Sequence, residues 1–147
     1  MKPINEMRLR IESRSVNEAF ARAAVAAFIS QLDPTLEEIS DIKTAVSEAV
    51  TNCIVHAYAD SVGQIYIWAG LYEGGGVRIK IRDTGCGIED VKKAMEPLYT
   101  TLGEERAGLG FAVMESFCDK LGVRSAPGKG TTVTLTKYIK GRNGGDD

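Results

Sequence analysis

The chain has 147 residues, 44% of them hydrophobic and 26% charged, and its 18 basic and 20 acidic residues give a net charge of −2. This length suits one domain with a buried core, and the composition is that of an ordinary globular protein. Because the basic residues form no block, direct binding of nucleic acid is disfavoured. The longest apolar stretch, residues 23–29, is too short to cross a bilayer, and no signal peptide is predicted.

Cysteine and histidine usage narrows the class of protein further. Cys53, Cys86 and Cys118 lie far apart and form no Cys-x-x-Cys pair, which predicts reduced thiols in a cytoplasmic protein. Two of them, Cys53 and Cys118, are interpreted as small apolar residues of helices. His56 is the only histidine, which disfavours a zinc site.

The N-terminal part of the chain predicts a strand and then a helix. Residues 7–14 alternate apolar and charged side chains, as a half-buried strand does. Ser15, followed three residues later by Glu18, predicts a capping box at the start of a helix over residues 15–31. The apolar stripe predicted for this helix consists of Val16, Phe20, Ala23, Ala27 and Phe28.

A second, longer helix is predicted to follow directly. Asp33 is its predicted N-cap and Pro34 its first residue, and apolar residues recur at spacings of three and four as far as residue 58. A break at Ser40 is an alternative, because Asp41 could cap a new helix.

The C-terminal part predicts two β-hairpins, separated by helices and a long loop. The predicted elements are strands 64–71 and 77–82, a short helix 88–95, a mobile loop 96–110, a helix 109–121, and strands 123–125 and 131–139. This order favours an α+β fold, a two-layer sandwich whose mixed, mostly antiparallel sheet carries helices on one face. We expect one domain over residues 1–140 and a disordered tail over residues 141–147.

The second helix carries the first group of candidate site residues. Glu48, Asn52 and His56 are spaced four residues apart and are predicted to share one stripe of the helix. A carboxylate can accept a proton, and a carboxamide oxygen can ligate Mg²⁺. Taken alone, the stripe is more typical of a solvated helix edge.

The segment after strand 77–82 carries the second group. Asp83 is followed by Gly85 and Gly87, so a carboxylate is predicted at the end of a strand with two glycines beside it. The carboxylate can accept a hydrogen bond from an exocyclic amine such as that of adenine, and the glycines would let a flat ligand approach the backbone. Taken alone, the segment also fits an ordinary turn.

Two further glycine motifs lie downstream. Gly108 and Gly110 precede the predicted helix 109–121, where free backbone N–H groups would form an anion site. Additional phosphate donors in the same loop are Thr100, Thr101 and Arg106. Gly130 and Thr131 open the last predicted strand, and alone they indicate nothing.

The four motifs together are more informative than any one of them. Glu-x-x-x-Asn on a helix, Asp-x-Gly-x-Gly after a strand, Gly-x-Gly before a helix and Gly-Thr on a strand occur in this order. The pattern resembles the ATP-binding domain shared by DNA gyrase, the heat-shock 90 chaperones, sensor histidine kinases and the MutL mismatch-repair proteins. The resemblance covers about residues 7–138. It implies an ATP site under a mobile lid.

Four stretches, beginning at Met7, Ser47, Ile81 and Glu96, resemble more narrowly the anti-sigma factors of endospore-forming bacteria that are serine protein kinases. This resemblance implies two partners, an RNA polymerase sigma factor that is held inactive and an anti-anti-sigma protein that is phosphorylated on serine in the control of sporulation. It also implies a homodimer. An exposed edge of strand 7–14 would suit one.

The same resemblance implies a role for each motif residue. Glu48 would be the general base, Asn52 the Mg²⁺ ligand and Asp83 the acceptor for the adenine amine. The residues that would complete the ATP site are Gly85, Gly87, Thr100, Thr101, Arg106, Gly108, Gly110 and Thr131, with Thr131 supporting Asp83 directly or through water. No lysine lies between Thr101 and Gly108 to contact the terminal phosphate. Arg22, an isolated arginine among alanines, is the predicted partner contact.

Three other functions are alternatives to this one. An ATP hydrolase would act without a protein acceptor, but its relatives couple ATP to extra domains for which this chain has no room. An ATP-gated binding module would sequester a partner without phosphotransfer, and it would need no base at Glu48. A general-stress anti-sigma kinase differs from the sporulation kinase only by resemblance.

Overall fold

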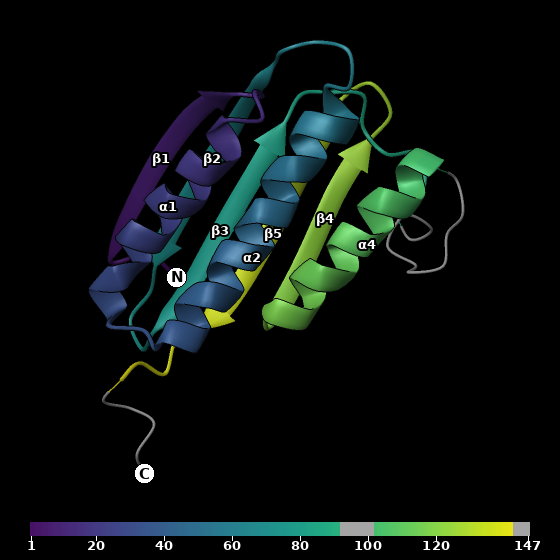
Figure 1. The fold of residues 1–147 in the computed structure, drawn as a ribbon. Coiled ribbons are helices and arrows are strands. Elements are labelled where there is room, and N and C mark those ends of the chain that lie inside the picture. Colours follow the sequence, from purple (N-terminus) through teal and green to yellow (C-terminus); the bar gives the residue numbers. More distant parts are fainter. Residues whose placement is uncertain (92–101, 143–147) are drawn as a thin grey trace.

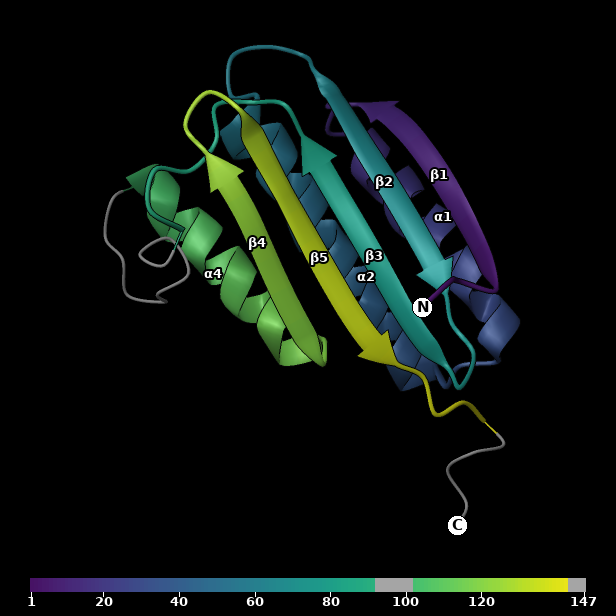
Figure 2. The same cartoon turned by 180° about the vertical axis from the view of Figure 1, so that it is seen from behind.

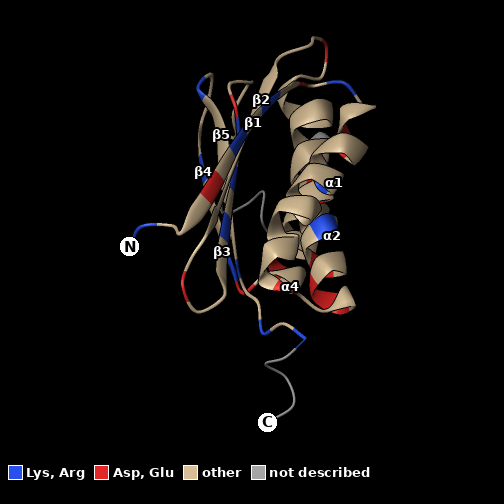
Figure 3. Ribbon diagram, turned by 90° about the vertical axis from the view of Figure 1, so that its left-hand side faces the viewer, with Lys and Arg blue, Asp and Glu red and all other residues tan. Residues whose placement is uncertain are grey.

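The computed structural model describes residues 1–91 and 102–142, which form two layers, a sheet and a set of helices on one of its faces (Figures 1 and 3). The elements are β1 Asn5–Glu12, α1 Asn17–Ile29, α2 Leu36–Asn52, β2 Gln64–Leu71, β3 Gly76–Asp83, α4 Leu102–Phe117, β4 Lys120–Ala126 and β5 Gly130–Tyr138. The strand order is β1-β2-β3-β5-β4, and every neighbouring pair is antiparallel. The predicted α+β sandwich is confirmed, with a sheet that is antiparallel throughout its described strands rather than mixed.

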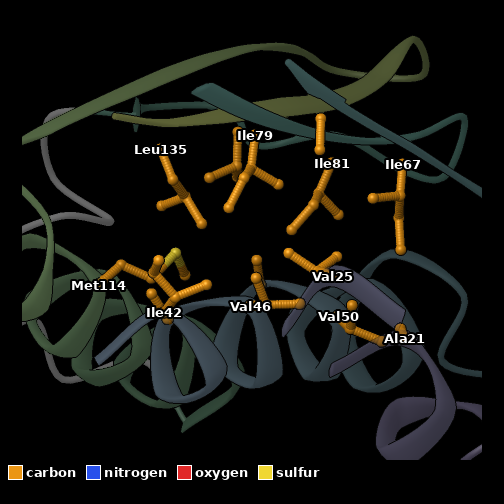
Figure 4. Packing of buried hydrophobic residues seen from close by; sticks show 14 of the residues in the cluster. Ala21, Val25, Ile42, Val46, Val50, Ile67, Ile79, Ile81, Met114 and Leu135 are labelled. Carbon is orange, nitrogen blue, oxygen red and sulfur yellow. The ribbon is translucent and has the colours of Figure 1, made fainter. Parts of the chain in front are cut away.

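The core lies between the two layers. Alternate residues of the strands point towards the helices, as the period of two requires, so that Ile67, Ile79, Ile81 and Leu135 face the apolar stripes of the helices. Figure 4 shows these sheet residues above Val25, Ile42, Val46, Val50 and Met114. All nine side chains are buried.

The start of α1 differs from the prediction. Val16 is the N-cap, and no side chain caps it, so the predicted Ser15–Glu18 capping box does not form. The carboxylate of Glu18 instead accepts a hydrogen bond from the Ser47 hydroxyl of α2. A contact between two helices has replaced the local contact that the sequence pattern predicts.

The buried face of α1 is also not the predicted one. Val16 and Phe20 are 74% and 54% exposed, and the buried residues are Ala21, Val25, Ala26 and Ile29. Relative to the prediction, the helix is rotated about its axis by about one residue. Small apolar side chains lie on both sides of α1, so the 3.6-residue period fits either face and does not determine which one is buried.

Helix α2 begins at a different cap and then runs without a break. Thr35 is the N-cap and forms a capping box with Glu38, whereas Asp33 has left-handed backbone angles with φ at 50°. The alternative break at Ser40 is not seen. The side chain of Asp41 pairs with Lys137 of β5 at 3.2 Å instead of capping a new helix. The α-helix ends at Asn52, and a single π-helical turn, Cys53–Ala57, follows it.

Three boundaries in the C-terminal half differ from the sequence prediction. Of the predicted helix 88–95, residues 88–90 are not helical, and the N–H of Ile88 donates to the Ser125 hydroxyl of β4 at 2.8 Å. Val91 is helical, and residues 92–95 lie outside the described residues. Helix α4 begins at Leu102, inside the predicted loop, and ends at Phe117. Strand β4 begins at Lys120, where pairing with β5 starts, and is therefore longer at its N-terminal end than the predicted strand 123–125.

The opposite face of the sheet carries no helix in the described part of the chain (Figure 2). Charged and aromatic side chains of β2 and β3 stack there, with Arg82 over Tyr66 at 4.1 Å and Lys80 over Trp68 at 5.5 Å.

The first two residues of the predicted tail form hydrogen bonds with the rest of the chain. The N–H of Gly141 donates to the Glu38 side chain, and the N–H of Arg142 donates to the Asp33 carbonyl. Within residues 1–91 and 102–142, no helix is long and apolar enough to cross a membrane.

Candidate functional site

The end of α2 brings together three of the predicted site residues. Glu48 and Asn52 lie one turn apart, and Gly110 of α4 packs against both. A Cβ added at Gly110 would lie 3.2 Å from the Glu48 Oε2 and 3.2 Å from the Asn52 Oδ1. Glycine at this position therefore lets α4 approach the two polar side chains closely.

Asn52 is the polar group of this site that has most to gain from a ligand. Its Nδ2 atom is buried and has no hydrogen-bond partner among the described residues. A buried unpaired amide destabilises a folded chain, and native proteins keep such groups mainly where they have a function. Asn52 is therefore suited to contact a bound molecule.

The π-helical turn shapes the next part of the site. It follows Asn52 directly, so His56 is not the third member of a regular α-helical stripe as predicted. Turns of this kind are often found at functional sites. The N–H of Cys86 donates to the Ala57 carbonyl at 3.2 Å, which ties the turn to the segment after β3.

Gly85 and Gly87 are required by the packing of the chain itself. A Cβ at Gly85 would lie 2.4 Å from the Ala57 carbonyl oxygen, and a Cβ at Gly87 would lie 2.0 Å from that of Ala126. Gly87 also has a φ of 76°, which disfavours other residues. The glycines thus hold the segment between the π-helical turn and the β4–β5 hairpin, beside Asp83.

Asp83 ends β3 and is 5% exposed. Its Oδ1 accepts hydrogen bonds from the backbone N–H of Gly85 at 2.9 Å and of Thr131 at 3.2 Å. Its Oδ2 accepts one from the Cys53 thiol, with a Sγ–Oδ2 distance of 3.5 Å. Burial raises the pKa of Asp83, and the three hydrogen bonds oppose that rise.

Thr131 contacts Asp83 directly through its backbone. It pairs with Asp83 in the β3–β5 register, and its backbone N–H donates to the carboxylate without a water between them. Its hydroxyl lies 2.8 Å from that of Ser125 on β4. Sequence reasoning missed Cys53 and Ser125 as site residues, since the first is an apolar-type residue of a helix and the second becomes relevant only through strand pairing.

The remaining predicted residues divide into two groups. Thr100 and Thr101 lie outside the described residues. Arg106, Gly108 and Gly110 lie within α4, which begins at Leu102. The predicted helix start at residue 109 is therefore wrong, because α4 begins six residues before Gly108, and the role of the two glycines in binding phosphate stays a prediction.

Arg22 of α1 lies on the far side of Glu48 from Asn52, where it faces a groove. It forms an ion pair with Glu18 at 3.6 Å and lines a groove of about 610 Å³ between α1 and α2. Glu48 lines the same groove. The Glu48 carboxylate thus borders both Asn52 and a surface that a second molecule can reach.

Oxygen ligands for a metal ion are few in this region. No group of three or more His, Cys, Asp or Glu side chains that could hold a metal is found in the part of the chain that the structure describes. Mg²⁺ commonly takes only one or two protein ligands and completes its shell with phosphate oxygens and water. Asn52 fits such a role.

Comparison with known proteins assigns the class. A family model described as a histidine kinase-like ATPase domain matches residues 11–137. Two solved structures share the fold. One contains the RsbU and RsbW domains of a Mycobacterium tuberculosis protein, with a TM-score of 0.68 and 24% identity over 93% of this chain and 33% of that one. The other is the histidine kinase domain of a blue-light activated kinase from Erythrobacter litoralis, with a TM-score of 0.55 and 22% identity over 84% of this chain and 61% of that one.

Relatives at much higher identity cover nearly the whole chain. A protein of Caldanaerobacter subterraneus named anti-sigma F factor is 61% identical over 95% of this chain and 96% of its own length. Proteins of the same name from a Thermoanaerobacter species and from Clostridium novyi are 59% and 54% identical, and the matches cover 97% and 96% of their lengths. The chain therefore belongs to the histidine kinase-like ATPase family, in the branch of the anti-sigma F factors.

Proposed function

We propose that this protein is an anti-sigma factor and an Mg-ATP-dependent serine protein kinase. It binds and inhibits an RNA polymerase sigma factor and phosphorylates an anti-anti-sigma protein on serine, in the control of sporulation. The observation that carries the proposal is the juxtaposition of Glu48 with the buried amide of Asn52. The names of the relatives support the choice of partners.

The adenine end of the nucleotide would be bound by Asp83. Its Oδ1 is occupied by two backbone N–H groups, so the Oδ2 is the atom available to an exocyclic amine. The burial of the carboxylate strengthens such a hydrogen bond, because water does not compete for it. Gly85 and Gly87 let the segment after Asp83 pack closely against Ala57 and Ala126, and this segment would form part of the wall beside the base.

The phosphate end would be bound near Asn52. Its carboxamide oxygen would ligate Mg²⁺, which when bound neutralises charge on the phosphate oxygens. Glu48, one turn earlier, would accept the proton of the acceptor serine as the hydroxyl attacks the terminal phosphorus. An ATP-gated binding module needs no carboxylate here, so the position of Glu48 favours a kinase.

Binding of Mg-ATP is the first expected result. A ligand that binds only the folded chain stabilises it by about 2.7 kcal/mol at a concentration 100 times its Kd. Thermal unfolding with and without Mg-ATP, Mg-ADP and magnesium alone measures the effect. If neither nucleotide raises the melting temperature, the ATP site is wrong.

The α1–α2 groove is the proposed contact surface for protein partners. Arg22→Ala should weaken the binding of both the sigma factor and the anti-anti-sigma protein by about 30-fold, the effect of an interface hot spot. Loss of its exposed ion pair with Glu18 should hardly change stability. Arg14→Ala is the control, since Arg14 pairs with Glu12 outside the groove. Unchanged affinity of Arg22→Ala for both partners, by calorimetry, would contradict the proposal.

The protein is also proposed to be a homodimer. Among the described strands, β1 is an edge strand that pairs only with β2, so one row of its backbone groups is open to pairing there. Pairing or packing across a two-fold axis would cover this edge. Light scattering at tens of micromolar should give twice the monomer mass, and a monomer mass would count against the dimer.

A further inference from the structure

Cys53 contacts the carboxylate on which the adenine contact of the proposed function rests. The residue is 4% exposed and begins the π-helical turn, directly after Asn52. Its Sγ lies 3.5 Å from the Asp83 Oδ2, within the range of a thiol hydrogen bond. The same helix end therefore presents Asn52 to the phosphate region and Cys53 to the base region.

The thiol can act only as the donor in this contact. An ionised carboxylate accepts hydrogen bonds and donates none. The thiol of Cys53 is a weak hydrogen-bond donor, and its Sγ lies 3.5 Å from the Asp83 Oδ2. The S–H group therefore donates to the Oδ2.

The hydrogen bonds that Asp83 accepts from the described residues leave one of its acceptor positions free. The Oδ1 accepts from the backbone N–H groups of Gly85 and Thr131, which occupy its two lone pairs. The Oδ2 also has two, and the Cys53 thiol takes one. The remaining lone pair is fixed in direction, because the carboxylate is held at both oxygens.

We propose that Cys53 is a positioning residue that orients the Asp83 Oδ2 towards the exocyclic amine of the base and so contributes to the selection of an aminopurine over an oxopurine nucleotide. The inference rests on the proposed function. A cysteine that only filled the core would need no polar partner, and it would affect all nucleotides alike. The hydrogen bond to Asp83 predicts that the effect depends on the amine.

Inosine triphosphate is the probe for this dependence, since it has an oxygen where ATP has the amine. Three variants are compared with the wild type in the presence of magnesium, namely Cys53→Ala, Cys53→Ser and Cys118→Ala. Cys53→Ala removes the donor, and Cys53→Ser removes the sulfur but keeps a donor. Cys118→Ala controls for the loss of a partly buried thiol outside the site. Calorimetry gives the Kd of each protein for both nucleotides, and thermal unfolding without nucleotide verifies that each variant is folded.

Cys53→Ala should bind ATP about two- to fivefold more weakly, as expected for a weak hydrogen bond, with a smaller change for inosine triphosphate. The preference for ATP should therefore fall in Cys53→Ala and stay unchanged in Cys118→Ala. The Cβ–O bond of serine is shorter than the Cβ–S bond of cysteine, so the hydroxyl would lie further from the Asp83 Oδ2. Cys53→Ser should therefore recover only part of the preference for ATP.

Two results would overturn the inference. One is an unchanged ratio of the two Kd values in Cys53→Ala, and the other is equal ratios in Cys53→Ala and Cys53→Ser. Either would assign Cys53 a packing role alone. Failure of the wild type to bind ATP would instead contradict the proposed function, so the two failures are distinguishable.

Discussion

Replacing Asp83 by asparagine should abolish the rise in melting temperature that Mg-ATP gives the wild-type chain. The two backbone N–H groups that bind the Oδ1 determine the orientation of the new side chain. They require an oxygen, so the amide nitrogen must take the place of the Oδ2. There it would meet two donors, the Cys53 thiol and the base amine. The loss of one charge-assisted hydrogen bond and the burial of an unpaired donor together weaken binding by about 3 kcal/mol, or roughly 100-fold.

A matched substitution separates this effect from a general loss of charge. Asp33→Asn makes the same chemical change at an exposed position remote from Asp83, and asparagine tolerates the left-handed backbone of Asp33. It should keep the full melting shift. If Asp83→Asn, folded without nucleotide, also shows a shift of wild-type size, Asp83 does not bind the base.

The parts of this site that the sequence predicts are those determined by local pattern. The alternation of residues 64–71 fits only a strand, and the structure has β2 at Gln64–Leu71. Asp83 lies at the end of the next strand because the apolar alternation stops there. Glu48 and Asn52 share a face because the helix is regular as far as Asn52. In each case the period of the element determines the position of the side chain.

The missed features depend on contacts between elements. Glu18 fits a capping box with Ser15, but its side chain binds Ser47 of the neighbouring helix. The second helix begins at Thr35, which forms a capping box with Glu38, and not at the predicted cap Asp33. Local patterns of this kind compete, and tertiary packing determines which of them forms.

Cys53 shows the same limit within the site. One residue after Asn52, it is indistinguishable in sequence from a core cysteine, and its contact with Asp83 requires the end of α2 to lie against the end of β3. Gly110 is a related case. Its predicted role was to open a helix N-terminus, whereas its place inside α4 lets that helix approach Glu48 and Asn52. A glycine motif indicates close approach, but the sequence does not say to what.

Glu48→Gln should separate phosphotransfer from binding. Glutamine keeps the size and hydrogen-bonding capacity of the side chain but does not take up a proton. Glu48 lies beside Gly110 and Asn52 on one side and lines the α1–α2 groove on the other, so its carboxylate lies between the proposed phosphate region and the surface from which an acceptor serine would come. The rate of phosphorylation of the anti-anti-sigma protein should fall by about 10²–10⁴-fold, the range for loss of a general base. Binding of Mg-ATP and of the sigma factor should stay at wild-type levels.

Two further variants define what that result means. Glu115→Gln changes an exposed carboxylate of α4 and should leave the rate unchanged. Asn52→Ala should fail earlier, losing magnesium-dependent nucleotide binding and with it both the sigma-factor complex and phosphotransfer, because it removes the proposed metal ligand itself. Single-turnover measurement with radiolabelled ATP gives the rate of the chemical step, and calorimetry gives the binding of nucleotide. A Glu48→Gln protein that phosphorylates its partner at the normal rate would exclude Glu48 as the base. The site would then act through the position and charge of the bound nucleotide alone, as catalysis of phosphoryl transfer by orientation and electrostatics permits.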